Sequence, residues 1–105
     1  MVKYTILLKR RDSIDRATFL KLWREGHLPL LRQLPGIRKI ELHEVIDVTN
    51  YPSEYDGLGM LWFDSVESAL AAFASPAGQA ARQDTPRFAD SSAAKRFFVE
   101  ELEDD

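Results

Sequence analysis

Apolar residues in this chain recur with two different periods, and the order in which the periods alternate limits the possible folds more than any other feature. Residues 2–9, 37–47, 55–64 and 94–102 carry the apolar, β-branched and aromatic content of strands. Three- and four-residue spacing predicts helices from residue 16 to about 34 and from 66 to 73. The order strand, helix, strand, strand, helix, strand predicts one α+β domain over residues 1–105. This ferredoxin-like βαββαβ domain has a four-stranded antiparallel sheet with both helices on one face.

The starts of both helices are marked by residues that cap helices. Asp15 precedes the first helix and Ser65 precedes the second, and the side chains of both types accept hydrogen bonds from the first free backbone N–H groups. The sequence of residues 75–90, after the second helix, predicts only a short helical excursion, a brief additional helix, followed by a loop. The glycines of the third strand allow another group to approach its backbone closely.

The first helix contains an unusual pair of residues, His27 and Pro29. His27 lies on the stripe that includes Phe19, Trp23 and Leu31 and that should face the core. Pro29 has no N–H to donate and disfavours helical geometry at the residue before it, so the helix should kink or restart there. A histidine is therefore predicted on a packing face beside a break in the backbone.

Neither side of the predicted third strand is clearly polar. Leu58, Met60 and Trp62 point one way, while Leu61 and Phe63 point the other. A monomer rarely exposes a sheet face this apolar, so we predict a homodimer in which two open sheet faces meet. Burial of roughly 400 Å² of apolar surface per subunit would contribute on the order of 10 kcal/mol before association costs.

Composition excludes several functional classes. The absence of cysteine excludes disulfides and thiolate chemistry and leaves His27 and His43 as the strongest neutral metal ligands, so no metal site is predicted. Five of the 17 acidic residues lie in the last six positions, and the remainder carries 14 basic and 12 acidic groups, which does not favour nucleic acid or an anionic membrane. Short apolar runs and early charges predict neither a membrane span nor a secretory signal, and hence a cytoplasmic protein. No phosphate loop, flavin fingerprint or nucleophile elbow occurs, so no cofactor is predicted.

The predicted topology is also that of RNA-recognition domains, and the third strand, "DGLGMLWF", has the glycine spacing of their central motif. Those domains place a basic residue at the start of this motif and aromatic residues at two positions where bases stack. Asp56, Leu58 and Met60 stand at these positions here. Stacking and charge both argue against RNA binding.

Two long stretches, "LLKRRDSIDRATFLKLWREGHLPLLRQLPGIRK" and "YDGLGMLWFDSVESALAAFASPAGQAARQDTPRFAD", together with the final hydrophobic strand, resemble the EthD-like family. This family is named for ethyl tert-butyl ether degradation and belongs to the dimeric α/β-barrel superfamily. The most specific pieces are the "W…E.H.P" helix, the "LWFDS" strand end and the "D…RF.D" segment. The resemblance implies a dimeric α/β barrel over nearly the whole chain.

What the resemblance implies about function is broader. Superfamily relatives include cofactor-free cyclases, lactone isomerases, decarboxylases and monooxygenases of small, often aromatic or polyketide-like compounds, and the fold alone does not choose among them. Our first hypothesis is a cofactor-independent lyase, isomerase or cyclase of a small hydrophobic or aromatic intermediate. The alternative is a non-catalytic auxiliary or binding protein for a degradative oxygenase system. The sequence identifies neither the substrate nor any use of oxygen.

His27 is the candidate catalytic residue. A neutral imidazole can take a proton from a carbon or hydroxyl acid and return it elsewhere, because its reference pKa is close to cellular pH, and the resemblance points to the same histidine. Asp84 and Asp90 are the candidate acidic partners that would orient the ring. The structural alternative is that His27 caps the broken helix or bonds a loop carboxylate, and that both aspartates are turn or cap residues. A catalytic role requires a cavity that reaches the ring.

The remaining candidates are aromatic or basic. Tyr4, Trp23, Trp62 and Phe88 could line a pocket for a planar substrate, although aromatic residues are also ordinary packing material. His43 lies in phase with Lys39 and Glu41 and is interpreted as an interface or surface residue. The basic residues at strand ends could attract an acidic substrate or could be solvated; they are Arg10, Arg11, Arg38 and Lys39.

Overall fold

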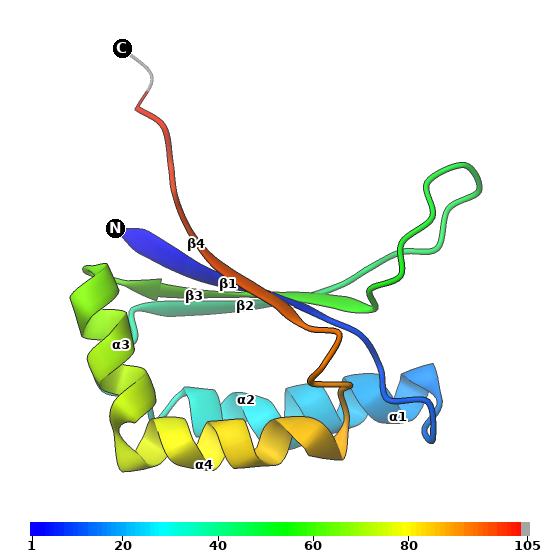
Figure 1. The fold of residues 1–105 in the computed structure, drawn as a ribbon, viewed down its shortest axis with the longest axis horizontal. Helices are drawn as coiled ribbons and strands as arrows, with labels where there is room; N and C mark the ends of the chain where they lie inside the picture. Colours follow the sequence, from blue (N-terminus) through cyan, green and yellow to red (C-terminus); the bar gives the residue numbers. More distant parts are fainter. Residues whose placement is uncertain (104–105) are drawn as a thin grey trace.

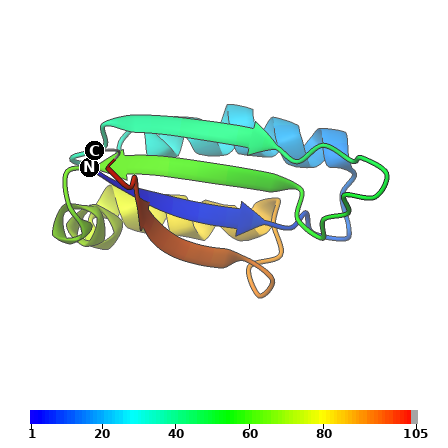
Figure 2. The same cartoon turned by 90° about the horizontal axis from the view of Figure 1, so that it is seen from above.

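The computed structural model describes residues 1–103 and has the predicted order of strands (Figure 1). The strands are β1 (Val2–Leu8), β2 (Lys39–Glu44), β3 (Gly57–Phe63) and β4 (Lys95–Glu100). They form one sheet in the order β2-β3-β1-β4, and every neighbouring pair is antiparallel. All helices lie on one face of this sheet, as the view from above in Figure 2 also shows. The predicted α+β, ferredoxin-like arrangement is confirmed.

The first helical unit is built from three pieces, α1 (Arg16–Lys21), the π-helical η1 (Leu22–His27) and α2 (Leu28–Leu31). Asp15 accepts a hydrogen bond of 2.8 Å from the backbone N–H of Thr18, which confirms it as the N-cap. At the break before Pro29, the N–H of Leu28 donates to the carbonyl of Trp23, five residues back. A wider turn accommodates the proline ring, which would otherwise clash with the carbonyl four residues before it.

The π-helical turn also keeps the buried stripe straight. Four of the buried residues follow one another at intervals of four, and a fifth comes three residues later; they are Phe19, Trp23, His27, Leu31 and Leu34. In an α-helix each interval of four residues rotates the next side chain by about 40°, so the stripe would wind away from the sheet. The π-helical turn rotates less per residue and offsets part of that drift. His27 therefore faces the sheet with its neighbours.

The second helical unit is larger than the sequence predicts. It contains α3 (Val66–Ala74), α4 (Pro76–Asp84) and a single 3₁₀ turn, η2 (Thr85–Arg87). The predicted N-cap Ser65 accepts from the N–H of Ser68 at 3.0 Å. Ser75 ends α3 and also caps α4, because its hydroxyl oxygen accepts from the N–H of Gly78. The predicted helical excursion within residues 75–90 is present as α4, but the helical part is longer than expected, because α4 packs through small side chains that give a weak hydrophobic period.

The first unit lies directly on two glycines of β3. A Cβ atom at Gly57 would lie 2.5 Å from the ring of Trp23, and one at Gly59 would lie 3.4 Å from the same ring. The contact at Gly57 excludes any larger side chain unless the indole moves, whereas a Cβ at Gly59 would touch the indole at ordinary contact distance and lie 3.2 Å from Ile6. The predicted close approach to the third strand is thus the approach of Trp23 to the sheet.

The interior contains two separate apolar clusters. One is built around Leu61, Phe63 and the small residues of α3, and the other around Phe19, Trp23 and Phe88. The gap between the clusters is where the candidate site is found.

The opposite sheet face has no helix over it (Figure 1). Strand register and side-chain alternation place a set of largely apolar residues there: Leu7, Leu58, Met60, Trp62, Phe97 and Val99. The hairpin formed by residues 45–56 extends beyond the sheet on this side, and its exposed side chains include Ile46, Val48 and Tyr51. Within residues 1–103, no helix has the length and apolar character needed to cross a membrane.

Candidate active site between the helices and the sheet

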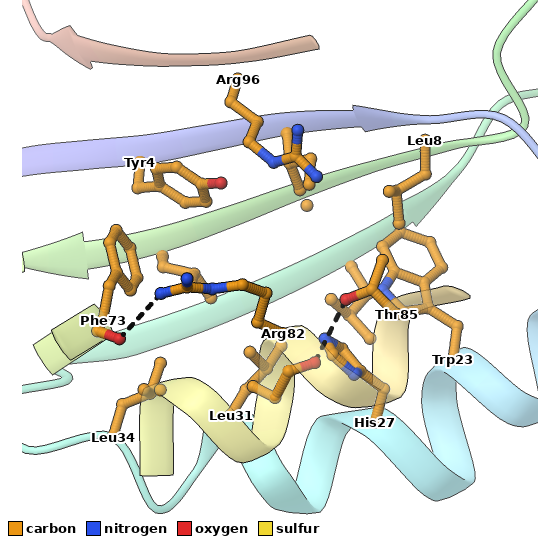
Figure 3. A pocket seen from close by; sticks show the side chains of 16 residues that line it. Tyr4, Leu8, Trp23, His27, Leu31, Leu34, Phe73, Arg82, Thr85 and Arg96 are labelled. Atoms are coloured by element: carbon orange, nitrogen blue, oxygen red, sulfur yellow. Dashed lines mark hydrogen bonds between the residues drawn. The ribbon is translucent and has the colours of Figure 1, made fainter. Parts of the chain in front are cut away.

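A cavity of about 250 Å³ lies between the sheet and the helices (Figure 3). Residues of both apolar clusters line it, including Leu8 and Trp23 from one and Leu31, Leu34 and Leu61 from the other. Polar groups come from Tyr4, His27, Arg82, Thr85 and Arg96. An apolar cavity with a few convergent polar groups is the usual form of a small-molecule site. The cavity that a catalytic His27 requires is present.

His27 is held in a fixed orientation by two neighbours. Its Nδ1 lies 2.9 Å from an Oδ atom of Asp84, the last residue of α4. The ring meets Phe88 edge-on, with 5.1 Å between ring centroids. The ring is 7% exposed, so it has little freedom to rotate. Of the two acidic partners predicted for His27, the structure brings Asp84 to the ring.

Asp84 needs more than His27 to remain charged. A carboxylate at the C-terminal end of a helix meets the negative end of the helix dipole, which is unfavourable. Arg87 offsets this by donating from Nε to the other Oδ atom at 2.8 Å. Burial would raise the pKa of Asp84, but the hydrogen bonds from Arg87 and His27 outweigh burial and lower that pKa. Asp84 is therefore a carboxylate at neutral pH.

His27 is neutral under the same conditions. Burial lowers the pKa of His27, and the hydrogen bond and charge of Asp84 only partly oppose burial. With Asp84 ionised, Nδ1 carries the proton and donates it to the carboxylate, and Nε2 is left as an acceptor. Nε2 has no hydrogen-bond partner among the described residues. It is nevertheless not one of the fully buried side-chain atoms, so part of its surface is accessible. A basic nitrogen is thus open to the cavity.

We expect the buried neutral histidine to make stability depend on pH. Because the pKa of His27 is lower in the folded protein than in the unfolded chain, the unfolded chain takes up a proton first as the pH falls through about 6.5. The free energy of unfolding should therefore decrease from pH 8 to pH 5 more steeply in the wild type than in a His27→Asn variant. Urea denaturation of both proteins across this range measures the difference. Parallel profiles would contradict the assignment of a neutral His27.

The other predicted site residues occupy three kinds of position. Tyr4 and Trp23 line the cavity. Phe88 is fully buried behind His27 and supports the ring without lining the cavity. Trp62 is on the opposite sheet face, where the Nζ atoms of Lys3 and Lys39 lie 5.5 and 4.9 Å from its ring.

Asp90 is also away from the cavity. Its carboxylate accepts hydrogen bonds from the backbone N–H and the hydroxyl of Ser92, so it stabilises a turn before β4. The structure therefore does not bring Trp62 or Asp90 to the pocket for which the sequence suggested them, because strand alternation and a local turn direct their side chains elsewhere.

His43 and the four basic residues also lie outside the cavity. His43 is exposed on the open face, with its Nε2 3.0 Å from Glu41, as its strand phase predicts. Arg38 pairs with Asp64 at 2.8 Å and Lys39 pairs with Glu41 at 3.0 Å. Arg10 and Arg11 donate to backbone carbonyls of loops. These contacts favour a structural role for the basic residues at the strand ends over attraction of an acidic substrate.

Three polar residues of the cavity were missed from the sequence. Arg82 is on α4 and Thr85 is on η2. The sequence did not predict that these elements pack beside the site. Arg96 is on β4, in phase with Phe98 on the side that faces the helices. The phase of Arg96 relative to Phe98 was the available signal.

Comparison with known proteins gives a family match over residues 11–92, to the EthD domain. An uncharacterised 11.0 kDa protein from the thcB–thcC intergenic region of Rhodococcus erythropolis is 30% identical over 98 residues, which cover 93% of this chain and 95% of that protein. An ethyl tert-butyl ether (EthD) family protein from Bacillus halodurans has a similar crystal structure, with a TM-score of 0.84, 24% identity and coverage of 97% and 99% of the two chains.

Two more distant solved structures share the fold. A dimeric protein of unknown function and ferredoxin-like fold from Bacteroides fragilis matches with a TM-score of 0.70 and 20% identity over 94% of each chain. SnoaB, a cofactor-independent oxygenase from Streptomyces nogalater, matches with a TM-score of 0.72 and 10% identity over 98% of this chain and 94% of that chain. At these sequence identities the similarity shows a shared fold and carries no statement about function.

Proposed function

The chain belongs to the EthD domain family, and from that premise we propose that it binds a small, mostly apolar molecule beside His27 and acts on it as a cofactor-independent lyase, isomerase or cyclase. The observation that carries the proposal is the Asp84–His27 pair at 2.9 Å, which leaves the second ring nitrogen open to the cavity. A structural histidine can make the same bond to Asp84, so what favours a catalytic role is that the ring also lines a cavity of ligand size.

The pair is suited to moving one proton. Nε2 of His27 takes a proton from an acidic carbon or hydroxyl of the ligand, and the imidazolium that forms is stabilised by the adjacent carboxylate of Asp84. The same nitrogen then returns the proton to another atom of the ligand. Because burial lowers the pKa of His27, the basic form is already populated at neutral pH. This sequence of steps suffices for an isomerisation, for a cyclisation or for protonation after loss of a leaving group.

The fold supports a site of this kind. SnoaB, which shares the fold, is a cofactor-independent oxygenase, so a protein of this architecture can catalyse a reaction without a cofactor. The cavity here is about 250 Å³, below the usual range for drug-sized ligands, and therefore favours a compact ligand such as a substituted ring.

The second part of the proposal is a homodimer formed through the open sheet face. Leu58, Met60 and Phe97 are apolar and lie on this face, and Phe97 is 43% exposed in the single chain. Burying such a face against a copy of itself is the simplest way to remove it from water. The dimeric state of the Bacteroides fragilis protein, which shares the fold, supports a dimer of this chain.

Hydron exchange tests the catalytic proposal without knowledge of the natural substrate. Aromatic ketones and 1,3-diketones with acidic C–H groups are incubated with the protein in D₂O, and loss of the C–H signal is followed by NMR. The expected result is exchange with at least one probe at a rate above that of buffer, rising through the pKa of His27. Binding of the probes without exchange would overturn the catalytic role and leave the non-catalytic binding role.

A further inference from the structure

The mouth of the cavity carries two positive charges that no acidic side chain of the described residues pairs with. Arg82 on α4 and Arg96 on β4 both line the cavity, and Figure 3 shows their guanidinium groups reaching it from opposite sides. Among residues 1–103, neither arginine belongs to an ion pair. None of the described residues that line the cavity is an aspartate or a glutamate.

The other charges of the region are already balanced. Asp84 is matched by Arg87, and His27 is neutral, so this group leaves no charge that could neutralise the two arginines. Arg82 makes one long contact of 3.4 Å with the backbone carbonyl of Phe73, which leaves most of its N–H groups free. Both arginines are exposed and solvated in the empty site, and their free N–H groups are available to an anion of a ligand that fills the cavity between them.

Tyr4 adds a third polar group at the same place. Its hydroxyl points toward the guanidinium of Arg96 in Figure 3. Burial raises the pKa of Tyr4 despite the nearby positive charges of Arg96 and Arg82, so the phenol remains protonated and can donate a hydrogen bond. Three donor groups thus gather at the mouth, and the apolar walls continue inward to His27.

We propose that the ligand of this site is a small organic carboxylate, whose acid group is held by Arg96, Arg82 and Tyr4 at the mouth while its apolar body reaches His27. This inference rests on the proposed function for its ligand cavity and adds the charge of the ligand. The planar guanidinium groups match a carboxylate, which accepts two parallel hydrogen bonds. The arginines are positioning residues, because they fix which atom of the ligand meets the base.

Matched pairs of probes test the charge of the ligand. Benzoate, 1-naphthoate and cyclohexanecarboxylate are each compared with the corresponding neutral amide, which has nearly the same shape. Binding is followed by NMR through the indole N–H of Trp23, which lines the cavity and is distinguished from that of Trp62 by a Trp62→Phe variant. The carboxylates should bind more tightly than their amides, with affinity that falls as salt concentration rises.

Arginine variants locate the anion. Arg96→Gln should lower carboxylate affinity by about 10- to 100-fold, as removal of a charge-assisted hydrogen bond does, and should leave amide affinity within about twofold. Arg82→Gln should act in the same direction. Arg32→Gln is the matched control, since Arg32 is exposed at the end of α2 and does not line the cavity.

Three results would overturn the inference, and they separate it from the proposed function. Equal affinity for carboxylates and amides would remove the anion site but keep the ligand cavity. Displacement of benzoate by inorganic phosphate at equal concentration would show a general anion site and not a carboxylate site. If no probe of either charge perturbs Trp23, the cavity does not bind such ligands, and the proposed function fails together with the inference.

Discussion

A His27→Asn variant should lose about 10²- to 10⁴-fold in the rate of hydron exchange, the range that a positioned general base contributes. Asparagine can still donate to Asp84 from its amide, so the local packing and the charge balance with Arg87 are preserved. It has no nitrogen that can accept a proton in place of Nε2. The measurement is the exchange rate at saturating probe, together with probe affinity, which should change little.

The second histidine provides the control for that experiment. His43 is exposed on the opposite sheet face and contacts Glu41, so His43→Asn should leave exchange unchanged. Equal exchange in the wild type and in His27→Asn would remove His27 from the chemistry. Equal loss in both histidine variants would point to a general effect on folding, which near-ultraviolet circular dichroism would detect.

A Met60→Glu variant should convert the proposed homodimer into monomers at micromolar concentration. Met60 is at the centre of the open face, next to Thr5 on β1 and Glu41 on β2. In a two-fold symmetric interface the substitution places a carboxylate on both subunits. Burying each unpaired carboxylate costs several kcal/mol, so the dissociation constant should rise by about 10³-fold or more. Sedimentation velocity measures the change in mass.

Leu70→Glu is the matched control for the interface. Leu70 is 55% exposed on α3, on the helical side of the molecule. Like Met60→Glu, the substitution replaces an apolar residue with an acid. This variant should remain dimeric. A wild type that sediments as a monomer, or a Met60→Glu protein that stays dimeric, would rule out association through this face.

The fold could be predicted from the sequence where local signals were strong. Asp15 and Ser65 marked the starts of two helices, and the alternation along β3 separated its two faces. Helix α4 was predicted only as a short excursion, because its buried positions are Gly78 and Ala81, which contribute little apolar area and give no clear period. At its junction with α3, a Cβ on Gly78 would lie 2.3 Å from the backbone oxygen of Phe73. This close turn requires glycine, but a single glycine does not define the length of the helix that contains it.

The site was predictable only in part for the same reason. His27 was conspicuous because it interrupts an apolar stripe, and Asp84 was one of two acidic candidates near the end of the chain. The choice between Asp84 and Asp90 depends on where α4 ends, which the sequence did not define. Arg82 and Arg96 come from different elements, so only the folded chain shows that both line the same cavity.

The π-helical turn before Pro29 lets this segment carry an extra residue without turning its buried face away from the sheet. Arg24 and Glu25 are exposed, so exchanging their side chains leaves the interior untouched. A variant that lacks one of these two residues would rewind as a regular α-helix, in which three residues rotate the chain by about 300°, only slightly less than four residues do in the π-helical turn. Trp23 and His27 would therefore still face the sheet together. The path of the backbone in this turn, more than the chemistry of its outer residues, is what sets the wall of the cavity.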